Sequence, residues 1–109
     1  MTDIMLVAPC TGNTLGKLAV GIIDTPVTLA CKSHLRGGRP LIIAVSTNDA
    51  LGSSAKNIGQ LLNYKNIYFV PMTQDSYKTK PLSIVADFNM ILETISYALD
   101  GVQIQPVLV

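Results

Sequence analysis

Residues 4–14 have the sequence IMLVAPCTGNT, and this segment indicates the architecture more clearly than any other. Its first five residues form a short, continuous apolar run, which predicts a strand buried on both faces, as in a parallel sheet. Pro9 is expected to end that strand. Residues 9–14 combine Pro, Gly and Asn with hydroxyl side chains, which is the chemistry of a turn. The segment therefore predicts a buried strand followed by a polar loop.

Two helices are expected after this loop. Apolar residues recur at i, i+3, i+4 and i+7 over residues 15–22, which is the spacing of one helix face. A second helix is expected after Asp24, with Thr25 as its cap, Pro26 in its first position and two glycines, Gly37 and Gly38, to stop it. The residues predicted to face inward on this second helix are Val27, Ala30, Cys31 and Leu35.

The rest of the chain continues to alternate strands and helices. Residues 41–45 (LIIAV) predict a second buried strand, and residues 67–70 (IYFV) predict a third. Between them, residues 46–49 (STND) form a turn that offers caps to a third helix, and residues 71–81 form a polar loop. A last helix is expected over residues 84–99, with Ser83 as its cap. The residues predicted to be buried on the third helix are Leu51, Ala55, Ile58 and Leu62.

This order predicts one α/β domain, residues 1–109, with a mainly parallel sheet and right-handed crossovers. Three strands make a thin sheet, since four to six are usual, although residues 106–109 could add an edge strand. Hydrophobic residues make up 49% of the chain and charged residues 14%, against about 25% charged residues in ordinary domains. We therefore expect a sheet that is incomplete at its N-terminus, and a large apolar face covered by another protein or by a missing part of the chain.

Composition also argues against several classes of protein. The net charge is +1 and the basic residues are scattered, so no nucleic-acid surface is expected. No apolar run approaches the length of a membrane span, and no signal peptide is evident. Cys10 and Cys31 have no metal-binding or redox spacing, which is typical of reduced thiols in a cytosolic protein, and no metal site is predicted.

The polar loops at residues 9–14 and 46–49 are the candidate site. Each follows a buried strand, and ligands of open α/β sheets bind outside the carboxyl ends of the strands. Both loops carry Asn and hydroxyl side chains that suit a neutral heterocycle, but neither carries a His, a Glu or a pair of carboxylates. Acid–base hydrolysis is therefore disfavoured, and a bound cofactor would be the reactive group. The simpler interpretation is that these polar residues only cap helices.

Residues 8–14 (APCTGNT), 17–19 (KLA) and 21–24 (GIID) resemble the APxTxNT…KxAxGxxD signature of the flavoprotein family, which includes phosphopantothenoylcysteine decarboxylase-like and lantibiotic decarboxylase-like enzymes. Longer runs, among them DTPVTLACKSHLRGGRP, resemble the dipicolinate synthase members of that family, of the B type, nearly from end to end. The resemblance implies a three-layer, flavodoxin-like (Rossmann-like) fold. It also implies an upstream strand–loop–helix portion, absent from this chain, whose Gly- and Ser-rich loop helps to hold the FMN phosphate.

The same resemblance implies FMN as the cofactor and assigns roles to both loops. The residues that fall on the flavin-side motif are Pro9, Thr11, Gly12, Asn13 and Thr14. Ser46, Thr47 and Asn48 fall where decarboxylase members have a substrate-contacting Pro-Ala-Met-Asn segment, and only Asn48 matches it. Decarboxylation of a peptidyl cysteine is therefore not supported.

The resemblance implies instead a subunit of a sporulation oxidoreductase in the mother-cell cytoplasm, which converts dihydrodipicolinate to dipicolinate. Its partner would be the A-type subunit of dipicolinate synthase, a nicotinamide-binding protein that would hold NADP, and a homo-oligomer is expected. Lys78 and Lys80 would attract the dicarboxylate substrate, although a solvated surface is the simpler interpretation. No catalytic residue is assigned. Two alternatives stay open: a non-catalytic scaffold for the partner, and a relative of the flavin-dependent decarboxylases.

Overall fold

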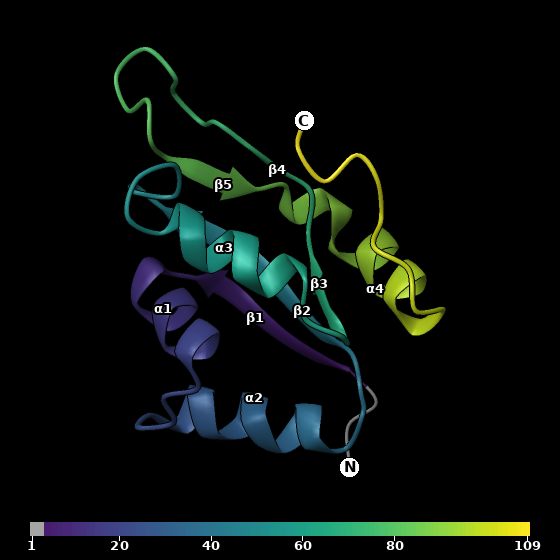
Figure 1. Cartoon of the computed structure of the whole chain (residues 1–109). Coiled ribbons are helices and arrows are strands. Elements are labelled where there is room, and N and C mark those ends of the chain that lie inside the picture. The colour runs from purple at the N-terminus through teal and green to yellow at the C-terminus, as the bar shows by residue number, and fades with distance from the viewer. Residues whose placement is uncertain (1–3) are drawn as a thin grey trace.

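The computed structural model describes residues 4–109 and arranges them as an open sheet with helices on both faces (Figure 1). The sheet has the order β1-β2-β5-β4, and β3 also pairs with β2. The strands β1, β2 and β3 run parallel, whereas β5 is antiparallel to both β2 and β4. The strands are β1 (Met5–Cys10), β2 (Leu41–Thr47), β3 (Ile67–Phe69), β4 (Met72–Thr73) and β5 (Ile84–Ala86). The helices are α1 (Gly12–Val20), α2 (Pro26–Arg36), α3 (Ala55–Leu62) and α4 (Ile91–Leu99), with a 3-10 turn, η1 (Phe88–Met90), before α4.

Strand β2 is the centre of the molecule, as its continuous apolar run predicts. Its first five residues are fully buried and alternate between two cores. Leu41, Ile43 and Val45 pack with residues of α1, α2 and α3, whereas Ile42 and Ala44 pack with α4. Helices therefore cover both faces of the sheet, and the expected three-layer, flavodoxin-like α/β architecture is confirmed (Figure 1).

Strand β1 differs from its prediction in burial and in length. Val7 and Cys10 are buried, but Leu6 is 38% exposed and both Ala8 and Pro9 are exposed. The strand does not end at Pro9. A bulge between Val7 and Cys10 adds one residue to β1, and this addition turns Cys10 to the same side of the sheet as Val7. Proline is tolerated there because a bulge does not require its missing N–H group.

Two helices bury only part of the face that was expected, since Cys31 of α2 and Ile58 of α3 are buried as predicted. On α2 the buried residues are Thr28, Cys31 and His34, whereas Val27 and Ala30 are exposed. The third helix starts only at Ala55, because hydrogen-bonded turns occupy residues 48–54. It buries Ile58 and Leu61. The predictions that Leu51, Ala55 and Leu62 would be buried were therefore wrong, since all three are exposed.

The expected helix over residues 84–99 is two elements. Its first residues form β5, because Ile84 and Val85 pair with β2 on one side and Val85 with β4 on the other. Asp87 then caps the following turn by accepting a hydrogen bond from Asn89 N at 3.0 Å. The expected loop at residues 71–81 likewise contains β4, so the sheet gains two short antiparallel strands that were not predicted.

Side chains and the C-terminal segment complete the hydrogen bonding of the outer strands. The Gln103 amide accepts a hydrogen bond from Phe69 N and donates one to Phe69 O, both at 2.7 Å. Leu108 forms a parallel bridge with Met72, so the expected edge strand at residues 106–109 is reduced to one bridge. Within residues 4–109, no helix has the length and apolar character needed to cross a membrane.

Candidate functional site

The two polar loops meet at the carboxyl ends of β1 and β2. Gly12, at the start of α1, marks the point of contact. A Cβ atom at this position would lie 2.9 Å from Ser54 Oγ, and 3.1 Å from both Asp49 Oδ1 and Thr47 Oγ1. Real Cβ atoms are not found so close to other groups, so only glycine allows the loops to approach in this way. The juxtaposition of the loops thus depends on a residue without a side chain.

The second loop is organised around the carboxylate of Asp49. It accepts hydrogen bonds from Ser53 Oγ at 2.5 Å, Thr47 Oγ1 at 2.6 Å and Ser54 Oγ at 2.9 Å. We call these four residues the Asp49 cluster. The three hydroxyl donors, Ser53 first, lower the pKa of the Asp49 carboxyl to about 2. Asp49 is therefore ionised at neutral pH and is a poor general base.

The position of this carboxylate determines which ligands suit the site. It lies beside Gly12 at the N-terminus of α1, where the helix dipole and unpaired N–H groups favour negative charge. Because Asp49 already supplies that charge, a second anion such as a phosphate would be repelled from the same place. A neutral group that exchanges hydrogen bonds fits this end of the helix better.

The first loop keeps its polar side chains available. Thr11 is the N-cap of α1, but its side chain accepts no capping hydrogen bond. Thr11 and Asn13 are exposed, and within residues 4–109 neither side chain is hydrogen-bonded to the protein. Pro9 is also exposed, and Thr14 is half-buried. The interpretation that the polar residues of this loop serve only as caps therefore does not describe Thr11.

The second loop contributes fewer free groups than its sequence suggests. Thr47 donates its hydroxyl to Asp49, and Ser46 is half-buried within β2. Asn48 is exposed, and its Oδ1 accepts a 3.4 Å hydrogen bond from Ser83 Oγ at the base of β5. The cap of α3 is Ser54 and not one of residues 46–49. Asn48 is therefore the accessible residue of the three proposed to contact substrate.

The two candidate lysines lie on the β4–β5 connection, which projects beyond the same end of the sheet as both loops (Figure 1). Lys80 Nζ lies 3.5 Å from Asp75 Oδ2, so its charge is partly neutralised. The pKa of Asp75 is lowered, chiefly by a hydrogen bond from Ser83 and also by Lys80. Lys78 is exposed and forms no ion pair within the described part of the chain.

The remaining reactive side chains have structural roles. Cys10 is fully buried, and burial, with a smaller effect of Cys31, raises the pKa of its thiol to about 12, so it is inert as a nucleophile. His34 is buried and its Nε2 donates to Pro40 O at 2.7 Å. Across residues 4–109, no three His, Cys, Asp or Glu side chains converge as metal ligands.

Sequence reasoning identified the first loop but missed three of the residues that shape the site. Ser53 and Ser54 complete the Asp49 cluster, and Ser83 donates a hydrogen bond to Asn48 Oδ1. The adjacent serines shortly after an Asp were a usable signal, because hydroxyls near an Asp commonly satisfy its carboxylate. Taken together, the arrangement can orient a neutral, polar, flat group, but it offers no acid–base pair.

Comparison with known proteins gives a consistent result. The family described as Flavoprotein matches residues 1–98. The B subunit of dipicolinate synthase from Bacillus subtilis (strain 168) is 45% identical over 107 residues, covering 98% of this chain and 54% of that protein. Flavin prenyltransferase UbiX of Thermoplasma acidophilum is 31% identical over 98 residues, covering 90% of this chain and 52% of that protein.

Two solved structures are similar as well. The B subunit of dipicolinate synthase from Bacillus halodurans C has a TM-score of 0.96 and 48% identity, covering 98% of this chain and 55% of that one. The FMN-dependent cysteine decarboxylase SpaF has a TM-score of 0.57 and 29% identity, covering 91% of this chain and 51% of that one. The chain thus spans about half the length of these relatives. Since the family match extends over most of its residues, the chain belongs to the Flavoprotein family.

Proposed function

We propose that this chain acts as part of a dipicolinate synthase, as a B-type subunit of the oxidoreductase that converts dihydrodipicolinate to dipicolinate during sporulation. The 45% identity to the corresponding Bacillus subtilis protein supports the assignment. The observation that carries it is the first loop, where the free side chains of Thr11 and Asn13 lie at the end of the sheet next to the Asp49 cluster. This arrangement suits a flat, neutral ring better than a nucleophile or a metal.

The residues of the first loop would hold the ring or the ribityl part of FMN. When bound, the flavin supplies the capacity to accept a hydride, which the side chains of this chain lack. Thr11 and Asn13 would hydrogen-bond to its neutral ring or ribityl groups, Pro9 and Thr14 would line it, and Gly12 keeps the two loops closed. Because Asp49 holds negative charge at the start of α1, the phosphate would bind away from this helix end.

The substrate would bind between the second loop and the β4–β5 connection. Asn48 would donate to a carboxylate of the dihydropyridine, with Ser46 beside it at the end of β2. Lys78 would attract the dianion, and Lys80 would contribute less because Asp75 already pairs with it. Thr47 would hold the loop in place through Asp49 rather than touch substrate. The partner would be the nicotinamide-binding A-type subunit, which carries NADP, in the cytoplasm, and this chain would also form a homo-oligomer.

Flavin titration of the purified 109-residue chain tests the cofactor assignment. Quenching of flavin fluorescence should be saturable, and riboflavin should bind within about threefold of FMN, because a phosphate without a partner adds little affinity. Thr11→Ala and Asn13→Ala should each weaken binding, whereas Ser96→Ala, an exposed change on α4, should not. Affinity unchanged in both loop variants would contradict the assignment.

The same titration separates the alternatives. Binding only by a longer version that carries the upstream region would mean that this chain holds half of the flavin site. Binding by neither version, together with restored dipicolinate formation when the chain is added to the A-type partner, would favour the scaffold, an alternative that the exposed Leu6, Val27 and Leu29 side chains support. The decarboxylase alternative is weaker, because Thr47 stands where decarboxylase relatives carry Met and its hydroxyl donates to Asp49.

A further inference from the structure

A pocket lies between α1 and α2, away from both polar loops. Its volume is about 410 Å³, within the range of about 300–1,000 Å³ that is usual for small-molecule sites. It lies against the C-terminal half of α1, whereas the first polar loop, residues 9–14, includes the first turn of that helix. Its main apolar and cationic lining residues are Leu18, Ile22, Leu35, Lys17, Lys32 and Arg36.

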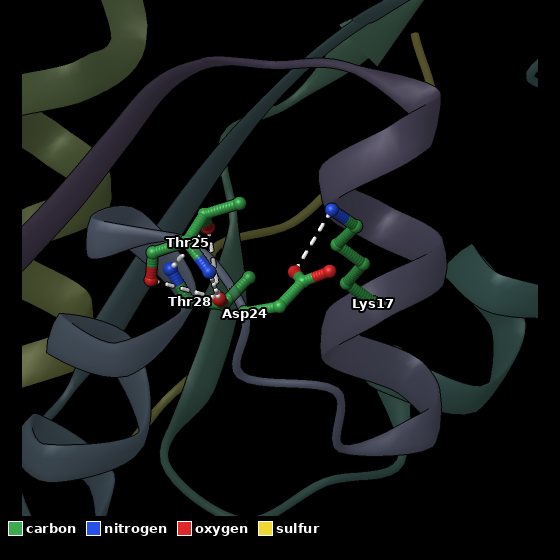
Figure 2. Close-up of polar contacts among 4 residues, drawn as sticks. All are labelled: Lys17, Asp24, Thr25 and Thr28. Carbon is green, nitrogen blue, oxygen red and sulfur yellow. Dashed lines mark hydrogen bonds and ion pairs between the residues drawn. The ribbon is translucent and has the colours of Figure 1, made fainter.

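The walls of this pocket are fixed by contacts that need no ligand. Gly21 has a φ of +79°, which lets the chain leave α1 and turn toward α2. Figure 2 shows that Lys17 reaches across this turn to Asp24, with Nζ 2.9 Å from Oδ1. The same view shows the capping box at the start of α2, in which Thr25 and Thr28 each accept a 3.1 Å hydrogen bond from the backbone N–H of the other. The pocket is therefore preformed.

The charges of the pocket are unevenly compensated. Lys17 is paired with Asp24, but Lys32 and Arg36 form no ion pair with any of residues 4–109. They lie four residues apart on α2, where two like charges face the same side and repel each other. The dipole of α2 favours a cation in its last turn, which accounts for the charge of Arg36. It does not account for the apolar side chains that line the pocket beside Arg36.

Exposed isoleucine side chains form part of the apolar lining of this pocket. Ile22 is 47% exposed and Ile23 is 41% exposed, and both line the pocket. The pocket is therefore lined both by two adjacent isoleucines and by the two cations, Lys32 and Arg36, that form no ion pair within residues 4–109. A molecule that satisfies both features has an apolar body and a negatively charged head.

We propose that this pocket binds a small organic anion with an apolar body, such as an alkyl or aryl carboxylate. The body would lie on Leu18, Ile22 and Leu35, and the carboxylate would lie between Lys32 and Arg36. The site is independent of the flavin loops, so a ligand here would bind alongside flavin and would not compete with it.

The test is an NMR titration of the ¹⁵N-labelled chain with octanoate and with 1-octanol, which has the same alkyl body and no charge. Octanoate should produce saturable shifts at the amides of Leu18, Ile22 and Lys32, and octanol should bind about tenfold more weakly. The double variant Lys32→Gln/Arg36→Gln should lose about fivefold or more of the octanoate affinity and none of the octanol affinity. Lys56→Gln, an exposed change on α3, is the matched control, and the spectra themselves report whether each variant is folded.

Three results would overturn the proposal. One is equal affinity for octanoate and octanol, and another is octanoate affinity that survives the double variant. The third concerns a second copy of the chain as the occupant of the pocket. Self-association in sedimentation velocity that octanoate blocks and that the double variant abolishes would assign the pocket to a protein–protein contact instead.

Discussion

The two loops at the carboxyl ends of β1 and β2 contain similar residues but use them differently. In the first loop the Thr11 and Asn13 side chains make no hydrogen bond to the described residues. In the second loop the hydroxyl of Thr47 is committed to Asp49, as are those of two serines. The two loops therefore differ in role. The hydroxyl groups of the second loop hold the protein's own structure, whereas the first loop has side chains that are free to bind a ligand. Gly12 is where the two are joined.

The largest effect is expected from forcing the loops apart. Gly12→Val would place a branched side chain where even a Cβ atom lies 2.9 Å from the buried Ser54 Oγ. Overpacking of this kind costs about 1–3 kcal/mol of folding free energy, measurable as a lower urea midpoint. Gly16→Ala is the control, since its nearest neighbour would be 3.5 Å away, and it should instead gain about 0.5–1 kcal/mol from helix propensity. A Gly12→Val chain as stable as the native one would mean that the loops are not tightly joined.

A smaller effect should follow from the charge of Asp49. Its pKa is about 2 in the folded chain, against about 3.9 for an unfolded Asp. The stability that this carboxylate contributes is therefore complete above about pH 4 and is lost as the pH falls toward 2. Asp49→Asn should be less stable than the native chain at about pH 7 and should lose less stability between about pH 5 and pH 2, as measured by urea unfolding at a series of pH values.

Asp24→Asn is the comparison for that series. The pKa of Asp24 is also lowered, chiefly by a hydrogen bond from Lys17, so its stabilising effect is lost in the same direction as the pH falls. Because this carboxylate is exposed and has one partner side chain where Asp49 has three, the acid-dependent loss of stability should change less than in Asp49→Asn. Equal effects of the two variants would argue against the Asp49 cluster as the support of the site.

The smallest effect on folding stability is expected from a substitution at Thr11. Thr25, the N-cap of α2, provides the comparison. Thr25→Ala removes the side chain that accepts from Thr28 N, and should cost about 1 kcal/mol. Thr11→Ala removes a cap that makes no such bond, so its cost should stay within about 0.5 kcal/mol. Thermal unfolding of both variants would measure the difference. A Thr11→Ala penalty as large as that of Thr25→Ala would return this residue to a purely structural role.

Much of the fold followed from apolar periodicity, and the errors have identifiable physical causes. The run at residues 41–45 could only be buried, and it forms the centre of the sheet. Ile84 and Val85 were ambiguous, because a short apolar run fits a helix or a strand equally well, and pairing with two other strands decided the outcome. The third helix was displaced because hydrogen bonds to Asp49 hold residues 48–54 in turns that periodicity does not report.

The sequence predicted which residue types form the site, but it did not predict which of their side chains are free to bind a ligand. The residue types of both loops indicated neutral hydrogen bonding, and the loops do meet. Which hydroxyls remain free depends on approaches between residues that are distant in sequence, such as Ser83 and Asn48, 35 positions apart. The pairing of Lys80 with Asp75 is likewise a matter of how the β4–β5 connection folds.

The hydrogen bonds between Gln103 and Phe69 have a further consequence, for aggregation. An unpaired strand edge exposes a row of N–H and C=O groups that another chain can use as a template. The amide of Gln103 occupies those groups on Phe69, and the bridge to Leu108 occupies part of β4 in the same way. The backbone groups of Phe69 and Met72 are therefore already hydrogen-bonded, and a foreign strand could not use them to extend the sheet at β3 or β4.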